Sequence, residues 1–443
     1  MTDTTRVRIH GVAHGGAGVG RSEPASPDAE PDGRTWFVHD ALPGELVEVE
    51  LLKAKRRYLR GRAVQILESS PDRVEAPCAF ASDCGGCSWQ YVRAGAQAQL
   101  KGEVVAGQLR RLVDEVHAVV PSPRSEGYRR RARMHYAREG QAFVLGFHRF
   151  RTREIEDQTG CMVLEPALDA ALQRLRAIGS LLPRRGEVHG VTDGRRVVLG
   201  LPGIKMFKAL HEALEGLVED DFESASDGLV GIVIRGGRRR ITIGQGSLPI
   251  DGGRYPAIGA GPFDFAQAQA GLNEQLVQHV AERCRAGIGA GAEVLELYAG
   301  SGNFTRAVAP GLGRVRAFDD ARDAINRLRG MAREHNLPVD ARRANVDRLL
   351  PQLVDDEERF DVVLLDPPRG GVGREGAAAI ARLAKRRIVY VSCDPATLAR
   401  DLEAMLEANP TLRVVEARVF DLMPMTAEVE TVVVLEPGGA SDG

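Results

Sequence analysis

The chain has 443 residues and a mass of 47.9 kDa, with 59 Lys and Arg against 61 Asp and Glu and a net charge of -2. This length predicts two to four domains of about 100 to 200 residues each, and a composition with 43% hydrophobic residues excludes general disorder. Near-neutral charge excludes a globally basic nucleic-acid binder, and without a secretory signal or an apolar run of about eighteen residues we expect a cytoplasmic protein with no membrane span.

Short alternating segments separated by glycines fill residues 1–70 and predict a small β-barrel. The strand-like runs are Val7–Ile9, Thr35–Val38 and Glu45–Leu51. The last predicted hairpin carries basic residues around an aromatic ring, namely Lys53, Lys55, Arg56, Arg57, Arg60 and Arg62 around Tyr58. A solvated strand face is the alternative, but cations with an aromatic ring are typical of RNA contact, which we favour.

Residues 71–262 contain four cysteines that form a candidate metal site. Cys78, Cys84 and Cys87 are close in the sequence, and Cys161 follows far downstream. Four thiolates suit an iron-sulfur cluster or zinc. Structural zinc usually draws on two close cysteine pairs, and only one is present, so the spacing favours a cluster.

Other patterns in residues 71–262 predict regular structure. Residues 93–118 are expected to be helical. An arginine cluster at residues 129–133 leads into strand-like runs at residues 133–136 and 143–147.

From residue 263 onward, strands, glycine turns and helices alternate, as is typical of a right-handed parallel α/β unit. The predicted strands are Glu293–Leu297, Arg314–Phe318, Phe360–Leu365, Arg387–Val391, Val414–Val419 and Thr431–Leu435. Before them, one face of a predicted helix is apolar and comprises Leu272, Leu276, Val277 and Val280. Cys284 extends this face, and we interpret it as a core residue.

The first of these strands runs directly into a glycine turn at Gly300 and Gly302, and the next strand ends at Asp319. Such glycines let backbone approach a ligand, and the carboxylate can accept hydrogen bonds from ribose hydroxyls. A dinucleotide fingerprint requires a further glycine where this chain has Thr305, so the turn favours S-adenosylmethionine. A purely structural turn is the alternative.

Two further motifs follow predicted strands. In Asp366-Pro367-Pro368-Arg369 the prolines hold a rigid loop that aims Asp366 into the ligand crevice. Amine methyltransferases have an aromatic residue in the place of Arg369, which argues against amine methylation. Cys393 follows a later strand; a lone cysteine is more often buried packing, but a thiol at such a loop tip is a candidate nucleophile.

Together these motifs resemble those of the bacterial RNA uracil-C5 methyltransferases of the 23S rRNA and tRNA type, over nearly the whole chain. The resemblance implies an N-terminal OB-like TRAM barrel (1–70) and a central α+β iron-sulfur domain (71–262), whose helical part at about 93–120 can pack on the catalytic domain. It implies a C-terminal α/β domain (263–443) of the class I, Rossmann-like S-adenosylmethionine-dependent methyltransferase type. The four cysteines match the ligands of the family's [4Fe-4S] cluster.

The resemblance also implies roles for individual residues. Cys393 is the expected nucleophile that adds to uracil C6, because C5 alone is too poor a nucleophile to accept a methyl group. Glu430 is the expected base that removes the C5 proton, and the target base must leave its stack to reach both groups. The expected cofactor and substrate-side positions are Gln267, Tyr298, Asn303, Asp319, Asn345 and Asp366.

The sequence departs from the family pattern near these positions. Gln269 and Asp394 stand where the family usually has asparagine, and Met425 and Glu428 stand where it has histidine. Three functions stay open: uridine-C5 methylation, cytosine-C5 methylation by the same thiolate chemistry, and non-catalytic RNA binding in assembly. Retention of Cys393 and Glu430 favours the first, the TRAM-like barrel favours 23S rRNA over tRNA, and we expect a monomer.

Overall fold

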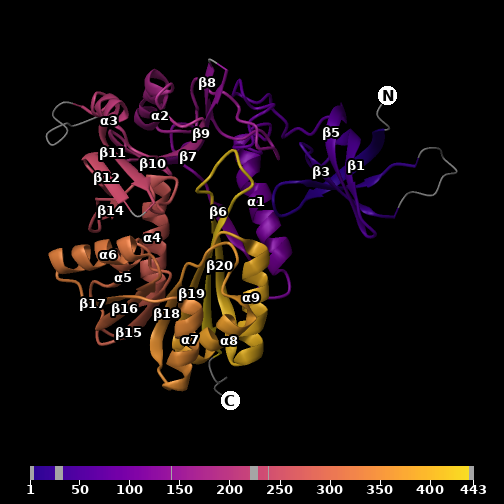
Figure 1. Cartoon of the computed structure of the whole chain (residues 1–443). Coiled ribbons are helices and arrows are strands. Elements are labelled where there is room, and N and C mark those ends of the chain that lie inside the picture. The colour runs from indigo at the N-terminus through magenta and orange to yellow at the C-terminus, as the bar shows by residue number, and fades with distance from the viewer. Residues whose placement is uncertain (1–3, 25–32, 141, 220–227, 238, 439–443) are drawn as a thin grey trace.

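The computed structural model describes residues 4–24, 33–140, 142–219, 228–237 and 239–438. Figure 1 shows a barrel formed by the N-terminal residues on the right, a mixed sheet with helices at the top, and a larger helix-covered sheet below. Across the described ranges, no helix is long and apolar enough to cross a membrane.

The barrel is closed by five strands in the order β1-β2-β3-β5-β4. They are β1 (Thr4–Val12), β2 (Gly18–Ser22), β3 (Thr35–His39), β4 (Leu46–Ala54) and β5 (Tyr58–Glu68). Alternate side chains such as Val7, Trp36 and Val49 point inward and are buried. The predicted β-barrel is therefore confirmed, and its basic hairpin is β4–β5.

The middle of the chain forms a six-stranded sheet in the order β12-β11-β10-β9-β7-β8. Its strands are β7 (Arg131–Glu139), β8 (Ala142–Gly146), β9 (Arg185–Thr192), β10 (Arg196–Pro202), β11 (Gly228–Gly236) and β12 (Arg239–Gly244). On one face it buries apolar side chains against α2 (Pro166–Arg174), a 3-10 turn (Leu175–Ile178) and α3 (Lys208–Glu215). The other face is partly covered by the β13 (Leu248–Ile250) and β14 (Ile258–Ala260) hairpin.

The C-terminal sheet has eight strands in the order β17-β16-β15-β18-β19-β21-β20-β6. Its strands are β6 (His117–Val120), β15 (Glu293–Leu297), β16 (Arg314–Asp319), β17 (Val339–Arg343), β18 (Phe360–Leu365), β19 (Ala384–Ser392), β20 (Leu412–Phe420) and β21 (Glu430–Pro437). Strands β15 to β19 are mutually parallel, whereas β21 runs antiparallel between β19 and β20. All six predicted strands are present; β17 was missed because its sequence, VDARR, is mostly polar.

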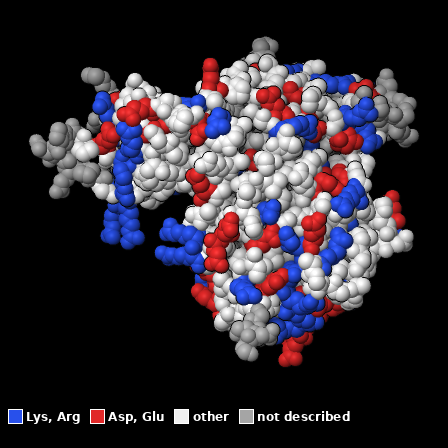
Figure 2. Space-filling model, turned by 180° about the vertical axis from the view of Figure 1, so that it is seen from behind, with Lys and Arg blue, Asp and Glu red and all other residues white. Residues whose placement is uncertain are grey.

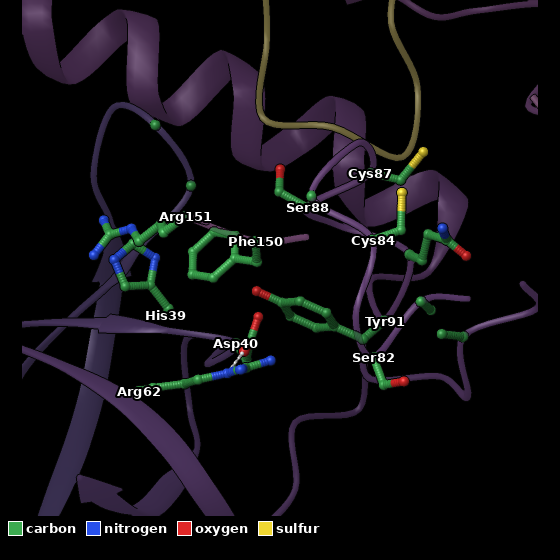
Figure 3. A pocket seen from close by; sticks show the side chains of 16 residues that line it. His39, Asp40, Arg62, Ser82, Cys84, Cys87, Ser88, Tyr91, Phe150 and Arg151 are labelled. Atoms are coloured by element: carbon green, nitrogen blue, oxygen red, sulfur yellow. Dashed lines mark hydrogen bonds and ion pairs between the residues drawn. The ribbon is translucent and has the colours of Figure 1, made fainter. Parts of the chain in front are cut away.

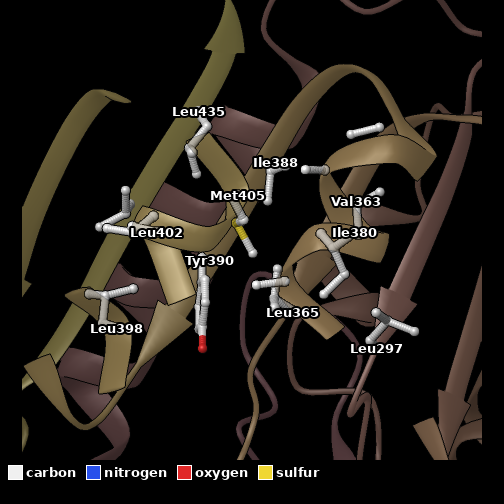
Figure 4. Close-up of a cluster of buried hydrophobic side chains, with 14 of the residues drawn as sticks. Leu297, Val363, Leu365, Ile380, Ile388, Tyr390, Leu398, Leu402, Met405 and Leu435 are labelled. Atoms are coloured by element: carbon white, nitrogen blue, oxygen red, sulfur yellow. The ribbon is translucent and has the colours of Figure 1, made fainter. Parts of the chain in front are cut away.

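Helices cover both faces of this sheet. One layer consists of α4 (Ala270–Arg285), α5 (Thr305–Val308) and α6 (Arg322–Glu334), and Cys284 is buried in it as predicted. The other consists of α1 (Ala94–Leu109), α7 (Val346–Asp355), α8 (Gly373–Leu383) and α9 (Pro395–Ala408). Figure 4 shows how Leu365 and Tyr390 of the strands face Ile380 and Met405 of these helices. Packing on both sides explains the nearly continuous apolar strand sequences.

The predicted helix over residues 93–118 is confirmed as far as Leu109 and is wrong beyond it. Helix α1 ends at Leu109, and His117–Val120 instead form β6 at the sheet edge, parallel to β20. The β-branched Val119 and Val120 directly precede Pro121, which favours an extended conformation. An open edge at β20 then supplies the pairing partner. In this way a segment from the middle of the chain completes the C-terminal sheet.

Candidate active site

The predicted catalytic residues meet at one edge of the eight-stranded sheet. Parallel strands place their carboxyl ends together, so Asp366 after β18 lies near Cys393 after β19. Strand β21 is antiparallel, and Ser392 pairs with Thr431. The next residues outward from this pair are Cys393 and Glu430, so the first residue of β21 reaches the same edge as the thiol.

The pKa values of these groups indicate that they lie close enough to influence one another's charge. Burial, followed by the charges of Glu430 and Asp366, raises the pKa of the Cys393 thiol to about 12. Burial raises the pKa of Asp366 to about 7, and burial together with Asp366 and Glu428 raises the pKa of Glu430 well above its ordinary value. Arg369 is the opposing cation, and its Nη2 lies 2.6 Å from Glu428 Oε2. The site therefore holds a neutral thiol beside carboxyls that can carry protons near neutral pH.

The loop at residues 421–429, which ends directly before Glu430, is held by side chains of α1. Lys101 on α1 is fully buried and its Nζ lies 2.5 Å from Asp421 Oδ1, while it also donates to the carbonyl of Met423. Gln97 Oε1 accepts a bond of 2.6 Å from Met425 N. These anchors were not predicted; the only sequence signal is a lysine among the apolar residues of a helix.

Residues outside α1 also hold this loop. Trp89 N donates to the carbonyl of Met425 at 2.9 Å, and the Tyr128 hydroxyl donates to that of Pro424 at 3.1 Å. Trp89 belongs to the cysteine-bearing segment, residues 78–89, which carries Cys78, Cys84 and Cys87. The position of Glu430 therefore depends on segments that precede the catalytic domain in the sequence.

The predicted cofactor side lies around the glycine turn after β15. Tyr298, Gly300 and Gly302 have positive φ angles of 60°, 55° and 96°. Asp319, at the end of β16, accepts a 2.9 Å bond from Gly300 N through Oδ2 and a 2.8 Å bond from Ala321 N through Oδ1. Asp319 thus holds the turn in shape at the edge where parallel sheets bind ligands.

Two other predicted cofactor residues make bonds within the fold. Asn303 and the buried Asn273 exchange two side-chain hydrogen bonds, of 2.9 and 3.0 Å. Asn345 is exposed, caps α7 and accepts a bond of 3.1 Å from Arg348 N. Both lie in loops that follow parallel strands, where ligands bind in such sheets. Their contact with a ligand stays a prediction.

Gln267 is buried and is linked to the cofactor side through an ion pair. Its carbonyl accepts a 2.8 Å bond from Arg130 Nε, and Arg130 makes a buried bidentate pair with Asp251 at 2.6 and 2.8 Å. Asn273 Nδ2 donates to the same carboxylate at 3.2 Å and bonds Asn303. Arg130, from the predicted arginine cluster, is therefore a structural link between two parts of the site.

The four cysteines of the predicted metal site are free and half-buried. Burial, followed by the charges of Cys161 and Cys84, raises the pKa of Cys87 to about 12, so these thiols lie near one another. Nevertheless, within the described ranges no three His, Cys, Asp or Glu side chains converge closely enough to hold a metal ion. Within the described residues the structure therefore shows no formed metal site at these cysteines, and their geometry does not support the predicted [4Fe-4S] cluster.

A pocket of about 210 Å³ lies beside these cysteines rather than at Cys393. Figure 3 shows Cys84 and Cys87 on one side of it and His39, Arg62 and Phe150 on the other. It therefore lies between the barrel and the cysteine-bearing segment. The Arg62 guanidinium is 5.7 Å from the Phe150 ring centre and pairs with Asp40 at 2.6 Å, so an ion pair and an aromatic ring share this wall.

A closed N-terminal barrel is joined to a Rossmann-like sheet with a thiol at its ligand edge, which is the arrangement that the resemblance to TRAM-bearing RNA methyltransferases predicts. Family models agree: the TRAM domain matches residues 3–64, and tRNA (Uracil-5-)-methyltransferase matches residues 260–437. The chain is 33% identical to the uncharacterized RNA methyltransferase SCO5901 of Streptomyces coelicolor, over 97% of this chain and 92% of that protein. It is 32% identical to the 23S rRNA (uracil(1939)-C(5))-methyltransferase RlmD of Methylococcus capsulatus, over 97% and 96%.

The chain belongs to the family of RNA (uracil-5-)-methyltransferases, and it is an enzyme of that family. A solved structure, Pyrococcus abyssi tRNA (uracil-54, C5)-methyltransferase with S-adenosyl-L-homocysteine, matches with a TM-score of 0.70 and 23% identity, over 97% of this chain and 99% of that one. This match supports the fold over the part of the chain that it covers. The predicted family, fold class and enzyme class are confirmed.

Proposed function

We propose that this enzyme methylates C5 of a uridine in RNA with S-adenosylmethionine as donor, and that the RNA is 23S rRNA. The observation that carries the proposal is the meeting of Cys393, Glu430 and Asp366 at the sheet edge that also bears the glycine turn. Relatives named as 23S rRNA uracil methyltransferases align with 92% or more of the chain, which supports rRNA over tRNA.

In this proposal, different residues act in different steps of the reaction. S-adenosylmethionine supplies an electrophilic methyl group when bound, and Asp319 with Tyr298, Asn303 and Asn345 would hold it at the glycine turn. Cys393 loses its proton and adds to uracil C6, which makes C5 nucleophilic. After methyl transfer, Glu430 removes the C5 proton so that the Cys393 adduct can eliminate.

The raised pKa values suit this sequence of steps. Two carboxyls that share a low-dielectric site do not both ionise readily, so the pair formed by Asp366 and Glu430 can hold one proton between them. The protonated member can donate to a uracil oxygen as negative charge develops there, with Gln267 as a further donor. The ionised member can accept a proton from the thiol or from C5.

The barrel supplies a surface for RNA. The side chains of Lys53, Lys55, Arg56, Arg57 and Arg60 on the β4–β5 hairpin are exposed, and Arg60 lies 5.6 Å from the Tyr58 ring centre. Figure 2 shows Lys and Arg side chains projecting from the barrel on the left, toward the open space beside the catalytic domain. Cations that contact phosphates beside a stacking ring are typical of RNA binding without strong sequence selection.

We also propose that Cys78, Cys84, Cys87 and Cys161 bind a [4Fe-4S] cluster with a structural role. The donor set is all thiol, and it comes from two segments whose thiols influence one another's pKa. A zinc ion with bonds of about 2.3 Å would draw four sulfurs into a tight tetrahedron, whereas a cluster spaces its thiolates more widely. Anaerobic purification should yield iron and sulfide; stoichiometric zinc without them would contradict the proposal.

The decisive experiment separates the roles of the thiol and the base. Cys393→Ala should abolish methylation and form no covalent RNA complex. Glu430→Gln should still permit attack and methyl transfer, so radiolabelled methyl groups should remain in a protein-RNA band on a denaturing gel. Glu436→Gln, at the far end of the same strand, is the matched control and should turn over normally. Normal turnover by Glu430→Gln, or an adduct at Cys284, would overturn the assignment.

Mass spectrometry of nucleosides identifies the product and the RNA. A strain without this gene should lose one 5-methyluridine from 23S rRNA. Loss of 5-methylcytidine would instead support cytosine chemistry, for which Asp366, with its pKa of about 7, could protonate N3. Loss of 5-methyluridine from tRNA would show that tRNA is the substrate, and unchanged nucleosides in both 23S rRNA and tRNA would contradict the proposal.

A further inference from the structure

The loop between β1 and β2 of the barrel reaches the catalytic edge. His14 Nε2 lies 3.1 Å from Asp394 Oδ2, across 380 residues of sequence. Two residues further on, Gly16 accepts a 3.1 Å bond from Trp89 Nε1, and a Cβ atom at Gly16 would lie 2.6 Å from that of Ala427. This barrel loop therefore touches the residue after the nucleophile and the loop that leads to the base.

Asp394 uses its two carboxylate oxygens for two different partners. Oδ1 caps α9 by accepting bonds from Ala396 N at 3.0 Å and Thr397 N at 2.9 Å, whereas Oδ2 faces His14. Burial opposes ionisation, but the helix amides and His14 together hold the pKa of Asp394 below its ordinary value. The asparagine usual in the family could cap the helix equally well, but it would carry no charge to attract an imidazole.

Cys393 is enclosed by the residues that this contact fixes. Asp394 N donates to Ser392 Oγ at 3.2 Å, and Ser392 Oγ lies 3.1 Å from the carbonyl of Asp394, so the residues on either side of the thiol bond each other. His14 Nδ1 is buried and has no partner among the described residues, which leaves Asp394 as the contact that orients the ring. A shift of Asp394 must therefore move Cys393.

We propose that His14 is a positioning residue for Cys393 and acts through Asp394, so that the RNA-binding barrel also holds the nucleophile loop in place. This inference rests on the proposed role of Cys393. A small displacement of a reacting atom lowers the rate of the chemical step strongly while leaving remote substrate contacts intact. The expected signature is thus a loss in kcat with little change in KM.

The test is a double-mutant cycle on the full-length enzyme with its RNA substrate. His14→Ala and Asp394→Asn should each lower kcat about tenfold and change KM for RNA less than about twofold. The double variant should be no slower than the single ones, because both remove one contact. His14→Gln, which keeps a donor, should recover part of kcat, and His10→Ala, at an exposed position of β1, should match the unmodified enzyme.

Three results would overturn the inference: multiplied losses in the double variant, a rise in KM with unchanged kcat, or full kcat in Asp394→Asn. Because asparagine keeps the helix cap, Asp394→Asn should fold even if His14→Ala does not. The outcome is separable from that of the proposed function. If Cys393→Ala abolishes methylation while His14→Ala is fully active, only the positioning role fails; if Cys393→Ala is active, the proposed function itself fails.

Discussion

The two sides of the catalytic edge are built in different ways. On the cofactor side, Asp319 holds Gly300 across 19 residues of sequence, within a single strand-turn-helix-strand unit. On the side of the target base, Lys101 holds Asp421 across 320 residues, and His14 meets Asp394 across 380. A local unit can form its turn by itself, whereas the other half exists only when the barrel, α1 and the C-terminal sheet are docked.

This difference predicts how the two sides respond to change. Substitutions in α1 or the barrel should disturb Cys393 and Glu430 while leaving the glycine turn intact. Substitutions at the turn should weaken donor binding without affecting the attachment of the domains. Four experiments, in order of decreasing effect, test that separation.

The largest effect is expected from Lys101→Met. Removal of the buried cation leaves Asp421 buried without its partner, which costs about 3 to 5 kcal/mol of unfolding free energy. Urea unfolding measures the loss. The matched control is Arg93→Met, which breaks an ion pair with the half-exposed Asp72 and should cost at most about 1 kcal/mol. Equal losses of unfolding free energy in the two variants would show that the loop before Glu430 does not depend on the ion pair between Lys101 and Asp421.

The second effect depends on pH. The folded protein raises the pKa of Asp366 to about 7. Because the protonated carboxyl is favoured in the folded state, Asp366 contributes to stability most at a pH below its ordinary pKa. This contribution is lost as the pH rises through 7. Asp366→Asn cannot ionise, and its stability relative to the unmodified enzyme should therefore rise by about 2 kcal/mol between pH 5 and pH 8. Denaturant unfolding at both values measures the change.

Asp340→Asn is the matched control for this pH effect. Hydrogen bonds from Arg342 and Arg314 lower the pKa of Asp340, so its contribution is present at high pH and is lost on acidification. Asp340→Asn should therefore show no relative gain at pH 8. If Asp366→Asn behaves like this control, the folded protein does not raise the pKa of Asp366.

The third effect concerns the cofactor side alone. Asp319→Ala removes the acceptor for Gly300 N and a candidate partner for ribose hydroxyls, and it should weaken S-adenosylmethionine binding by about 1 to 3 kcal/mol. Titration calorimetry measures the affinity for S-adenosylmethionine, and Asp320→Ala, at the exposed neighbouring position, is the control. RNA affinity should stay unchanged; a parallel loss of RNA binding would mean that the two sides are not independent.

The smallest effect is expected on the barrel hairpin. Arg56→Ala and Arg57→Ala should each reduce the slope of log affinity against log salt for RNA by about 1, because each removes one phosphate contact. Lys208→Ala, an equally exposed cation on α3, should leave the slope unchanged. A slope that does not change in any variant would exclude this hairpin from the RNA interface.

Prediction from sequence succeeded where the signal is short-range. The β-barrel, the six predicted strands of the catalytic domain and the buried Cys284 follow from alternation, helical periodicity and continuous apolar runs, although β2 was not predicted as a strand. It failed over residues 110–120, where the helix stops and β6 forms, because the strand is stabilised by pairing with β20 rather than by its own sequence. The sequence showed Arg130 only as one member of an arginine cluster and gave no sign of its buried pair with Asp251, because Asp251 is remote in sequence.

The sequence by itself determined where the six predicted strands lie along the chain, the glycine turn after the first of them, and the presence of a thiol and a carboxyl at strand ends, since each depends on neighbouring residues. That Asp319 closes this turn through Gly300 N was seen only in the structure. Only the tertiary structure decided that β21 runs antiparallel to β19, which brings Glu430 to Cys393. It alone joined Lys101 to Asp421 and His14 to Asp394. Such contacts leave no local pattern, because their partners are chosen by the docking of preformed units rather than by the chain on either side.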